Sequence, residues 1–379
     1  MNKNYQICSS CVMDTTEPEI TFDELGVCNH CHTFADVTSK GWFPNEEGTH
    51  RLEKIVEQIK AAGKGREYDC ILGLSGGIDS SYLAMKAHKW GIRPLVVHVD
   101  AGWNSELSVA NIEKIVKHCD FHLYTHVVGW EDMRDLQLAY LRSGIANQDV
   151  PQDHIYFASI YHFAIKNGIK YNLSGGNIAT EGIFPKAWHG DAMDAINLHA
   201  IHRRYGKSRL KSYSTISFLQ YYIWYPFIKG MRTIRPLNYM PFDKAKAVSE
   251  LEASIGWRSY GCKHGESVFT KFFQNYYLPT KFGYDKRKPH LSSLVVSGQM
   301  TREEALLKLE EPLYDQNEIE MDIVYFCKKL RINRVEFDEL MAIPVHHYTD
   351  FPNWEYRYRL LKKGQTLFER YIARVGISH

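Results

Sequence analysis

Apolar and polar positions follow two different patterns through the middle of the chain. Residues 68–74 and 94–100 are short, continuous apolar runs, which are typical of strands buried on both faces of a parallel sheet. Residues 81–90, 105–119 and 130–143 instead repeat their apolar side chains with a helical period. Strands and helices therefore alternate along the chain, and this order predicts an α/β fold with a doubly wound parallel sheet.

Three more strands complete the expected sheet. They are predicted at 121–128, 170–174 and 232–237, with helices at 153–166 and 243–255. Ligands of such sheets bind beyond the carboxyl ends of the strands. We therefore expect the segments that follow the first, second and fourth strands to meet in one crevice.

The segment after the first strand carries the most informative motif, Ser75-Gly76-Gly77-Ile78-Asp79-Ser80-Ser81. Its glycines let backbone N–H groups turn toward an anion, the following helix adds partial positive charge, and its serine hydroxyls can donate to phosphate oxygens. Asp79 places a carboxylate beside those phosphates, which favours Mg²⁺. The Lys of a Walker A loop is missing. A Gly-Gly turn followed by a helix cap is the alternative interpretation.

This motif matches without departure the SGGxDS signature of the PP-loop, or N-type ATP pyrophosphatase, superfamily, and the chain resembles that superfamily. The resemblance implies an adenine nucleotide alpha-hydrolase-like fold that binds ATP through residues 75–81, here called the PP-loop. It also implies that the backbone near Val97 and Val99 accepts the adenine.

Residues that follow two other strands extend the expected ATP site. These are Asp100, Gly175, Gly176 and Asn177. NAD synthetases of the superfamily carry a metal-binding Glu a few residues after such a glycine-rich turn, and Glu181 resembles that residue. The resemblance implies one Mg²⁺ held by Asp79 and Glu181. An exposed loop Glu is the alternative.

The N-terminal segment predicts a structural Zn²⁺ site. Two Cys-x₂-Cys pairs are separated by sixteen residues, which is zinc-ribbon spacing. We expect residues 1–45 to form the ribbon, with a β-hairpin at 13–26 between the two knuckles. No apolar segment follows Lys3, so we expect a cytoplasmic protein without disulfides. The four expected ligands are Cys8, Cys11, Cys28 and Cys31.

Composition excludes some classes of function. The 379 residues include 46 basic and 44 acidic side chains, a net charge of +2, which does not describe a general nucleic-acid binder. The sequence contains no run of eighteen apolar residues, so we expect no membrane span. We expect an ATP-binding domain at 46–260, with a basic and aromatic insertion at about 185–230, and a mainly helical region at 261–379. Helices are predicted there at 301–309, 318–330, 334–341 and 354–373.

The insertion contains two segments with open interpretations. Residues 203–211 are basic and could bind the phosphates of a substrate, or form a solvated surface. Residues 213–228 are rich in Tyr, Phe and Trp, which favours packing in the core, with a partner-binding face as the alternative.

A further segment, Tyr260 to Ser267, includes Lys263 between Cys262 and His264. Together with the ribbon and the PP-loop it resembles the N-acetyl sugar amidotransferase family, the WbpG type of lipopolysaccharide O-antigen biosynthesis. The resemblance runs over essentially the whole chain. It implies a cytoplasmic, ATP-dependent enzyme that adenylates the acetamido oxygen of a nucleotide-activated sugar and replaces it with ammonia, giving an acetamidino group and AMP. Lys263 is our catalytic candidate beside Asp79, because a Lys can stabilise the adenylate.

The nitrogen source is expected to lie on another protein. Asn2 is not the Cys that an N-terminal-nucleophile glutaminase needs, and Cys262 lacks the glycines of a nucleophile elbow. The family resemblance implies a glutaminase subunit and a cyclase-like barrel subunit as partners, and a homodimer is also possible. The alternatives are a PP-loop enzyme that thiolates tRNA, and a nucleotide-binding scaffold without catalysis.

Overall fold

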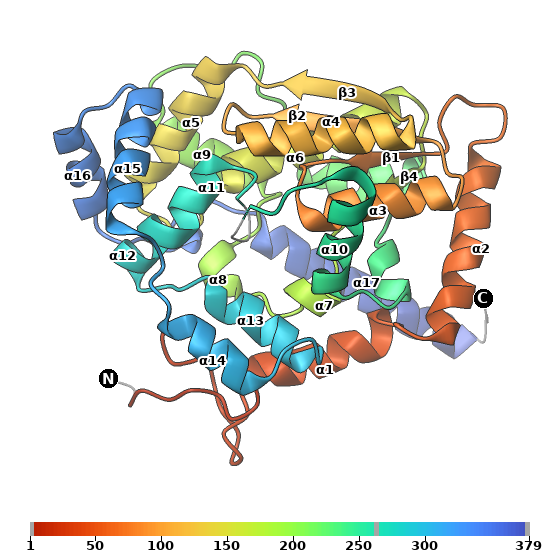
Figure 1. Ribbon diagram of the computed structural model, residues 1–379, viewed down its shortest axis with the longest axis horizontal. Helices are drawn as coiled ribbons and strands as arrows, with labels where there is room; N and C mark the ends of the chain where they lie inside the picture. The colour runs from red at the N-terminus through yellow and green to blue at the C-terminus, as the bar shows by residue number, and fades with distance from the viewer. Residues whose placement is uncertain (1–3, 261–264, 376–379) are drawn as a thin grey trace.

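The computed structural model describes residues 4–260 and 265–375, with side chains up to residue 366. Its centre is a sheet of five parallel strands in the order β3-β2-β1-β4-β5 (Figure 1). The strand order reverses between β1 and β4, which makes this the switch point of a doubly wound sheet. The predicted fold class is therefore confirmed. The strands are β1 (Cys70–Gly73), β2 (Pro94–Asp100), β3 (His122–Val127), β4 (Tyr171–Leu173) and β5 (Arg232–Ile234).

Burial along the strands follows their place in the sheet. In β1, Ile71 pairs with Leu95 of β2 and with Asn172 of β4, and every residue of β1 is buried. The outer strand β3 is mostly exposed. Strand β1 is continuously apolar because helices cover both faces of the sheet at its centre.

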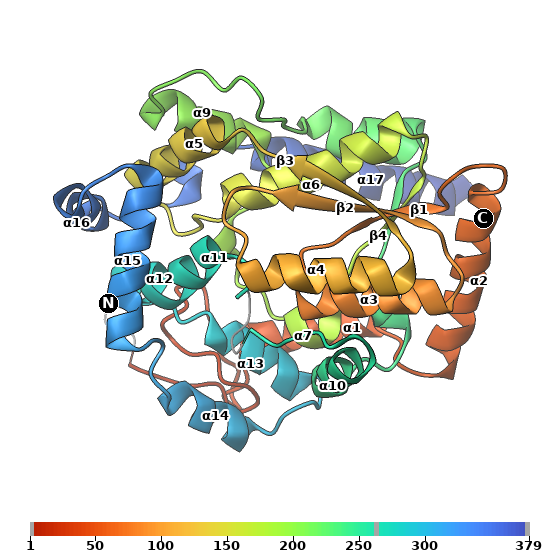
Figure 2. The same cartoon turned by 45° about the horizontal axis from the view of Figure 1, so that its top comes forward.

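Helices cover the sheet in two layers, which Figure 2 shows on opposite sides of the strands. One layer consists of α3 (Ile78–Lys89), α4 (Glu106–Cys119) and α10 (Lys244–Ile255), and α2 (Glu46–Ala62), at the end of the sheet, adds Ile59 to the same core. The other consists of α5 (Trp130–Ser143), α6 (Val150–Lys166) and α9 (Ala195–Tyr205).

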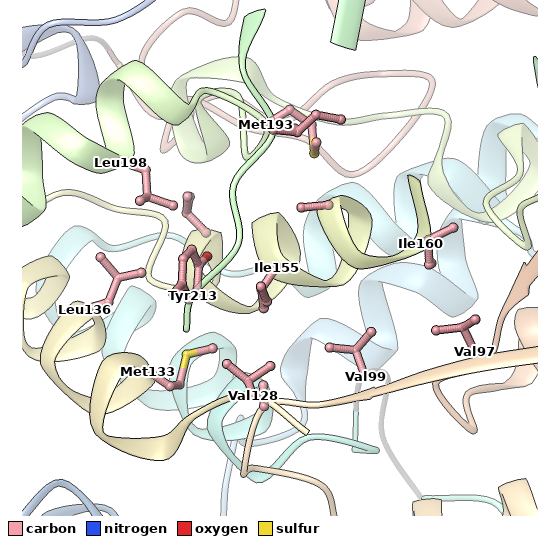
Figure 3. Close-up of a cluster of buried hydrophobic side chains, with 14 of the residues drawn as sticks. Val97, Val99, Val128, Met133, Leu136, Ile155, Ile160, Met193, Leu198 and Tyr213 are labelled. Carbon is pink, nitrogen blue, oxygen red and sulfur yellow. The ribbon is translucent and has the colours of Figure 1, made fainter. Parts of the chain in front are cut away.

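The core between β2 and α6 fixes one wall of the later site. Val97 and Val99 point from β2 toward Ile155 and Ile160 of α6 (Figure 3). Tyr213, from the segment after α9, joins the same cluster. The hydrophobic packing of these β-branched side chains holds α6 against the strands that carry the ligand loops.

The C-terminal part is helical, as predicted, and lies beside the carboxyl ends of the strands. The capping box expected at Thr301 is present, with Glu304 as its partner. The helices are α11 (Val268–Phe272), α12 (Leu278–Phe282), α13 (Arg287–Val296), α14 (Arg302–Glu310), α15 (Gln316–Leu330), α16 (Arg334–Ala342) and α17 (Glu355–Val375), with a π-helical turn at Phe273–Tyr277. None of the helices in the described part of the chain is both long and apolar enough to cross a membrane.

Several element boundaries differ from the prediction. The helix after the PP-loop begins at Ile78 rather than at 81, because Gly77 is its N-cap and Ser80 Oγ donates to the Gly77 carbonyl at 3.2 Å. The last strand ends at Ile234 and gives way to a 3₁₀ helix at Pro236–Tyr239, since Pro236 has no N–H for the ladder.

The predicted hairpin at 13–26 is wrong. This stretch consists of turns, with isolated bridges joining Ile7 to Asp14 and Phe22 to Cys28. Acidic side chains take the backbone donors that a strand ladder would use; Asp23 Oδ1, for example, accepts from the N–H groups of Leu25 and Val27. The second cysteine pair leads directly into α1 (Asn29–Gly41).

The aromatic stretch at 213–228 is divided between core and surface. Tyr213 and Tyr225 are buried, whereas a π-helix at Gln220–Ile228 leaves Trp224 and Phe227 exposed. The interpretation as core therefore holds for only part of it.

Candidate functional site

The PP-loop lies at the switch point of the sheet, and its backbone requires glycine. Gly76 has a φ of +84°, and a Cβ atom there would lie 2.8 Å from the carbonyl oxygen of Ser108. Both the conformation and the space therefore exclude other residues. The Gly77 N–H donates to Ser75 Oγ at 3.3 Å, a weak contact that a phosphate oxygen can replace.

Two aromatic side chains donate hydrogen bonds to a backbone carbonyl of the PP-loop. The Gly76 carbonyl accepts from the Tyr260 hydroxyl at 2.8 Å and from Trp257 Nε1 at 3.2 Å. Asn111 in turn donates to the Tyr260 hydroxyl at 3.1 Å. These contacts fix the Gly76–Gly77 peptide of the loop before any ligand binds. These roles are not predictable from local sequence, because the three residues lie far along the chain from the loop.

The segment after β4 packs directly on the first turn of α3. A Cβ atom at Gly175 would lie 2.9 Å from the Asp79 carbonyl carbon and the Ser80 nitrogen, so only glycine allows this approach. Asn177 Oδ1 accepts from the Thr180 N–H at 3.0 Å and caps the short helix α7 (Ile178–Glu181). Glu181 thus sits at the end of a capped helical turn and not in a free loop.

Two cavities meet at the PP-loop. The β2-side cavity has a volume of about 660 Å³ and includes His98 and Val99 in its wall. The β5-side cavity, of about 540 Å³, includes Asp79 and Asn172. The residues that line both are Ser75, Tyr156, Phe157, Gly176, Glu181, Arg235 and Glu266. Because one set of side chains faces both spaces, two ligands can meet at the loop.

The C-terminal part supplies the outer wall of the β2-side cavity. Its residues there are Glu266, Ser267, Thr270, Phe273, Gln274, Lys286 and His290. Backbone hydrogen bonds join this wall to the loop after β2. The Ser105 N–H donates to the Glu266 carbonyl at 2.9 Å, and the Val268 N–H donates to the Trp103 carbonyl at 2.9 Å. The space beside the PP-loop is therefore shaped by both parts of the chain.

A buried histidine connects the strand ends. His98 Nδ1 lies 3.0 Å from the Leu74 carbonyl, which makes it the donor, so Nε2 accepts from Asn104 Nδ2 at 2.9 Å. Burial lowers the pKa of His98. A neutral imidazole thus bridges the residue before the PP-loop and the loop after β2.

The structure brings together most, but not all, of the predicted ATP-binding residues. Gly77, Asp79, Ser80, Gly175 and Asn177 line one of the two cavities, in addition to the residues that line both.

Five predicted residues lie elsewhere or outside the described residues. Ser81 and Val97 are fully buried, and Asp100 accepts from the Gly102 N–H at 2.8 Å. None of these three lines either cavity, and neither does Gly76, whose carbonyl is bonded by Tyr260 and Trp257. Lys263 lies outside the described residues.

The basic segment 203–211 lines neither cavity. Asp135 holds it against α5, since its carboxylate accepts from His202 Nε2 and from the N–H groups of Lys207 and Ser208, at 3.0–3.1 Å. His189, which lies before this segment in the insertion, does line the β2-side cavity. The interpretation of 203–211 as a phosphate site gains no support from this arrangement.

The four predicted zinc ligands converge on one point. Cys8 and Cys31 Sγ lie 3.9 Å apart, and Cys28 Sγ lies 3.7 Å from both Cys11 and Cys31. Four thiolates at the usual Zn–S distance of about 2.3 Å form a tetrahedron with edges of about 3.8 Å. Backbone N–H groups also donate to Cys8 Sγ, at 3.2–3.4 Å. The cluster therefore fits a closed, structural Zn²⁺ site.

This cysteine cluster rests on the same helices that support Glu181. Arg302 of α14 donates to the carbonyls of Cys8 and Cys11, and Ser292 of α13 accepts from the Val12 N–H at 3.1 Å. Two further serines bond α7 and the residues after it. Ser297, the C-cap of α13, donates from Oγ to the Ala179 carbonyl at 2.8 Å, and Ser293 Oγ of α13 accepts from the Ile183 N–H at 3.0 Å. The cluster and the predicted Mg²⁺ ligand thus share one scaffold.

Comparison with known proteins bears on the outer wall. Residues 266–365 match a family model described as "LPS biosynthesis protein WbpG-like, C-terminal domain". The C-terminal part of this chain is WbpG-like. The resemblance to WbpG-type proteins inferred from the sequence is therefore confirmed for residues 266–365, and the matched region begins at the first residue of the wall described above.

Two solved structures are also similar to the chain. An NH3-dependent NAD synthetase from Campylobacter jejuni has 12% identity and a TM-score of 0.28, over 41% of this chain and 72% of its own. An NMN synthetase from Francisella tularensis has 14% identity and a TM-score of 0.27, over 54% of this chain and 92% of its own. Similarities of this size add nothing to the argument from the site. No curated protein matches the sequence significantly.

Proposed function

We propose that this chain is an ATP-dependent amidotransferase that converts the acetamido group of a nucleotide-activated N-acetyl sugar into an acetamidino group. The observation that carries the proposal is that the WbpG-like part of the chain forms the wall facing the PP-loop across the β2-side cavity. A family-specific wall opposite a phosphate-binding loop is the place where such an enzyme would select its sugar substrate.

In this proposal the PP-loop holds the phosphates of ATP. The Gly77 N–H and the hydroxyls of Ser75 and Ser80 would bind oxygens of the departing pyrophosphate and keep it in line with the attacking oxygen. Asp79 and Glu181 line the same cavity and would hold Mg²⁺. When bound, that ion would neutralise charge on the pyrophosphate. Arg235, which lines both cavities, is placed to attract the phosphates of either nucleotide.

The chemistry follows from the poor leaving ability of an amide oxygen. The amide oxygen attacks the α-phosphorus, pyrophosphate leaves, and the adenylated carbon can then accept ammonia with loss of AMP. Enclosure by Tyr156, Phe157 and the C-terminal wall would keep water from the activated carbon. Lys263 stays a candidate for stabilising the adenylate.

Incubation with ATP, Mg²⁺, ammonium and a panel of UDP-N-acetyl sugars tests the proposal. We expect AMP, pyrophosphate and a product one mass unit lighter than its substrate, because an amide oxygen is replaced by an NH group. The tRNA-thiolating alternative predicts no such product, and activity on tRNA with a sulfur donor. ATP binding without pyrophosphate release, with every sugar tested, would indicate a scaffold.

A further inference from the structure

Two aspartates on one face of α6 have no assigned role. Asp149 precedes α6 and Asp153 follows one turn later, and both line the β2-side cavity together with Ser75 and Glu181. The ordinary role of an Asp before a helix is to cap it. Asp149 occupies the N-cap position, but its side chain makes no capping hydrogen bond. Its carboxylate is directed elsewhere.

The contacts of these carboxylates leave acceptors turned toward the cavity. Asp149 is only 7% exposed, and its Oδ1 accepts from the neutral donors Gln152 Nε2, at 2.9 Å, and Thr270 Oγ1, at 3.0 Å. Within residues 4–260 and 265–375, Asp149 Oδ2 and both oxygens of Asp153 accept no hydrogen bond. A buried carboxylate without a cationic partner is costly.

The charges around the pair favour an added cation. Burial raises the pKa of Asp149, and Asp153 raises it further; burial also raises the pKa of Asp153, with Glu181 adding to the effect. Lys286 opposes both shifts, but its Nζ lies 2.7 Å from His189 Nε2 and 5.4 Å from the centre of the Phe184 ring. The lysine therefore offsets the negative charge without bonding to either aspartate.

Carboxylates are unexpected beside two polyphosphate substrates, which they repel. The proposed reaction, however, also involves nitrogen cations: its nucleophile is supplied as ammonium, and its product is an amidinium. We propose that Asp149 and Asp153 form the ammonium subsite of this enzyme. The inference rests on the proposed function and names the group that receives the nitrogen nucleophile.

The step at this subsite balances in atoms and protons. Ammonium gives one proton to a carboxylate oxygen, and the lone pair that is freed forms the new C–N bond at the adenylated carbon. The C–O bond to AMP breaks, and its electron pair leaves with AMP. Because the adenylated amide has already lost its N–H proton and is an imidate, attack by ammonia and loss of AMP give the amidinium directly. The proton on the carboxyl group then passes to solvent, which restores the carboxylate.

A second cavity adjoins the one that contains the pair. The cavity beside α8 (Lys186–His189) has a volume of about 260 Å³ and shares Asn147 and His189 with the β2-side cavity, and Val150 at the start of α6 also lines it. Apolar side chains, among them Ile145 and Trp188, make up much of its lining. This second cavity lies next to the aspartates in sequence and space, because Asn147 and Val150 flank Asp149 along the chain.

Asp149→Asn and Asp153→Asn test the subsite while conserving side-chain size. We expect each variant to raise the KM for ammonium at least tenfold, while single-turnover release of pyrophosphate, which precedes nitrogen attack, stays within about threefold of wild type. Asp69→Asn is the matched control, since Asp69 is equally buried but pairs with Arg93 at the opposite end of β1. An unchanged KM for ammonium in both aspartate variants, or an equal loss of pyrophosphate release, would overturn the proposal.

A binding measurement separates this inference from the proposed function. Ammonium chloride should raise the melting temperature of the wild-type protein more than sodium chloride at the same ionic strength, and both Asp→Asn variants should lose this difference. That result supports the subsite even where no sugar is converted. Equal effects of the two salts on the wild type would contradict the subsite. So would Asp→Asn variants that keep the stabilisation by ammonium chloride and lose the stabilisation by MgCl₂.

Discussion

At the scale of single residues, Asp79 carries the sharpest expectation. Asp79→Asn keeps the shape of the side chain and removes the charge that would hold Mg²⁺ against pyrophosphate. We expect AMP formation to fall by about a hundredfold or more, with little change in the melting temperature. Asp120→Asn is the control, because Asp120 is exposed at the end of α4 with a φ of 52°, a conformation that Asn also adopts. Wild-type turnover in Asp79→Asn would exclude the metal role.

Two adjacent glycines offer a matched pair of variants. In Gly175→Ala the new methyl group would meet the backbone of Asp79 and Ser80 at 2.9 Å and push the PP-loop away from β4. In Gly176→Ala the closest atom is Ser174 Oγ at 3.5 Å, an ordinary contact. We expect Gly175→Ala to weaken ATP binding about tenfold or more, and Gly176→Ala to weaken it far less, as measured by calorimetry. Equal effects would mean that the close approach does not matter.

The sequence predicted residues whose chemistry depends on local spacing. The four cysteines and the PP-loop are examples, because each motif is defined by the spacing of residues within one short stretch of sequence. The placement of Ser81 was not predictable in this way, since the first turn of α3 turns its side chain into the core. Arg235, Asp149 and Asp153 enter the site only through the packing of β5 and α6. A pair of aspartates four residues apart at a helix start was the one signal that could have indicated them.

At the scale of elements, helix α13 connects the cysteine cluster to α7. Cys11→Ser should lower the zinc content and, because α13 bonds both the knuckle and α7, also weaken MgATP binding. Metal analysis and calorimetry measure the two effects. The control is Cys119→Ser, a buried thiol of α4 outside the cluster, which should keep its zinc. Full MgATP affinity in zinc-free Cys11→Ser would show that the two sites are independent.

The elements themselves were largely predictable. The order of strands and helices was right because continuous apolar runs and helical periods differ clearly in this chain. The errors occurred where side chains compete for backbone groups. The turns at 13–26 use Asp and Glu acceptors in place of a ladder, and Pro236 ends the last strand early. Neither effect changes the pattern of apolar residues, so the pattern could not indicate them.

At the scale of the whole molecule, the active space is an assembly of distant segments. The PP-loop and α6 form one side of the β2-side cavity, and the WbpG-like region, which begins only at residue 266, forms the other. The domain boundaries at 45 and 260 stay predictions. Because the wall is bonded to the loop after β2, we expect neither part to bind the sugar nucleotide alone.

The same assembly bears on the source of nitrogen. Among the described cysteines outside the zinc cluster, Cys70, Cys119 and Cys327 are buried, and burial raises the pKa of each thiol. A glutaminase needs an accessible thiolate, so these residues are unsuited to that role. The isolated chain should therefore work with ammonium salts, better as the pH rises toward the pKa of ammonium, and should fail with glutamine. Mass analysis of the sugar product with each donor measures this.

A separate glutaminase should make glutamine usable without altering the chain itself. The decisive comparison adds a glutaminase and a cyclase-like barrel subunit to this protein at neutral pH, with no ammonium salt present. We expect glutamine-dependent product only in the complete mixture, and we expect Asp153→Asn to impair turnover with either donor, because both nitrogen sources would reach the same aspartates. If Asp153→Asn impaired turnover with ammonium alone, glutamine nitrogen would have to enter by another path. Glutamine-driven turnover by the isolated chain would overturn the need for a partner.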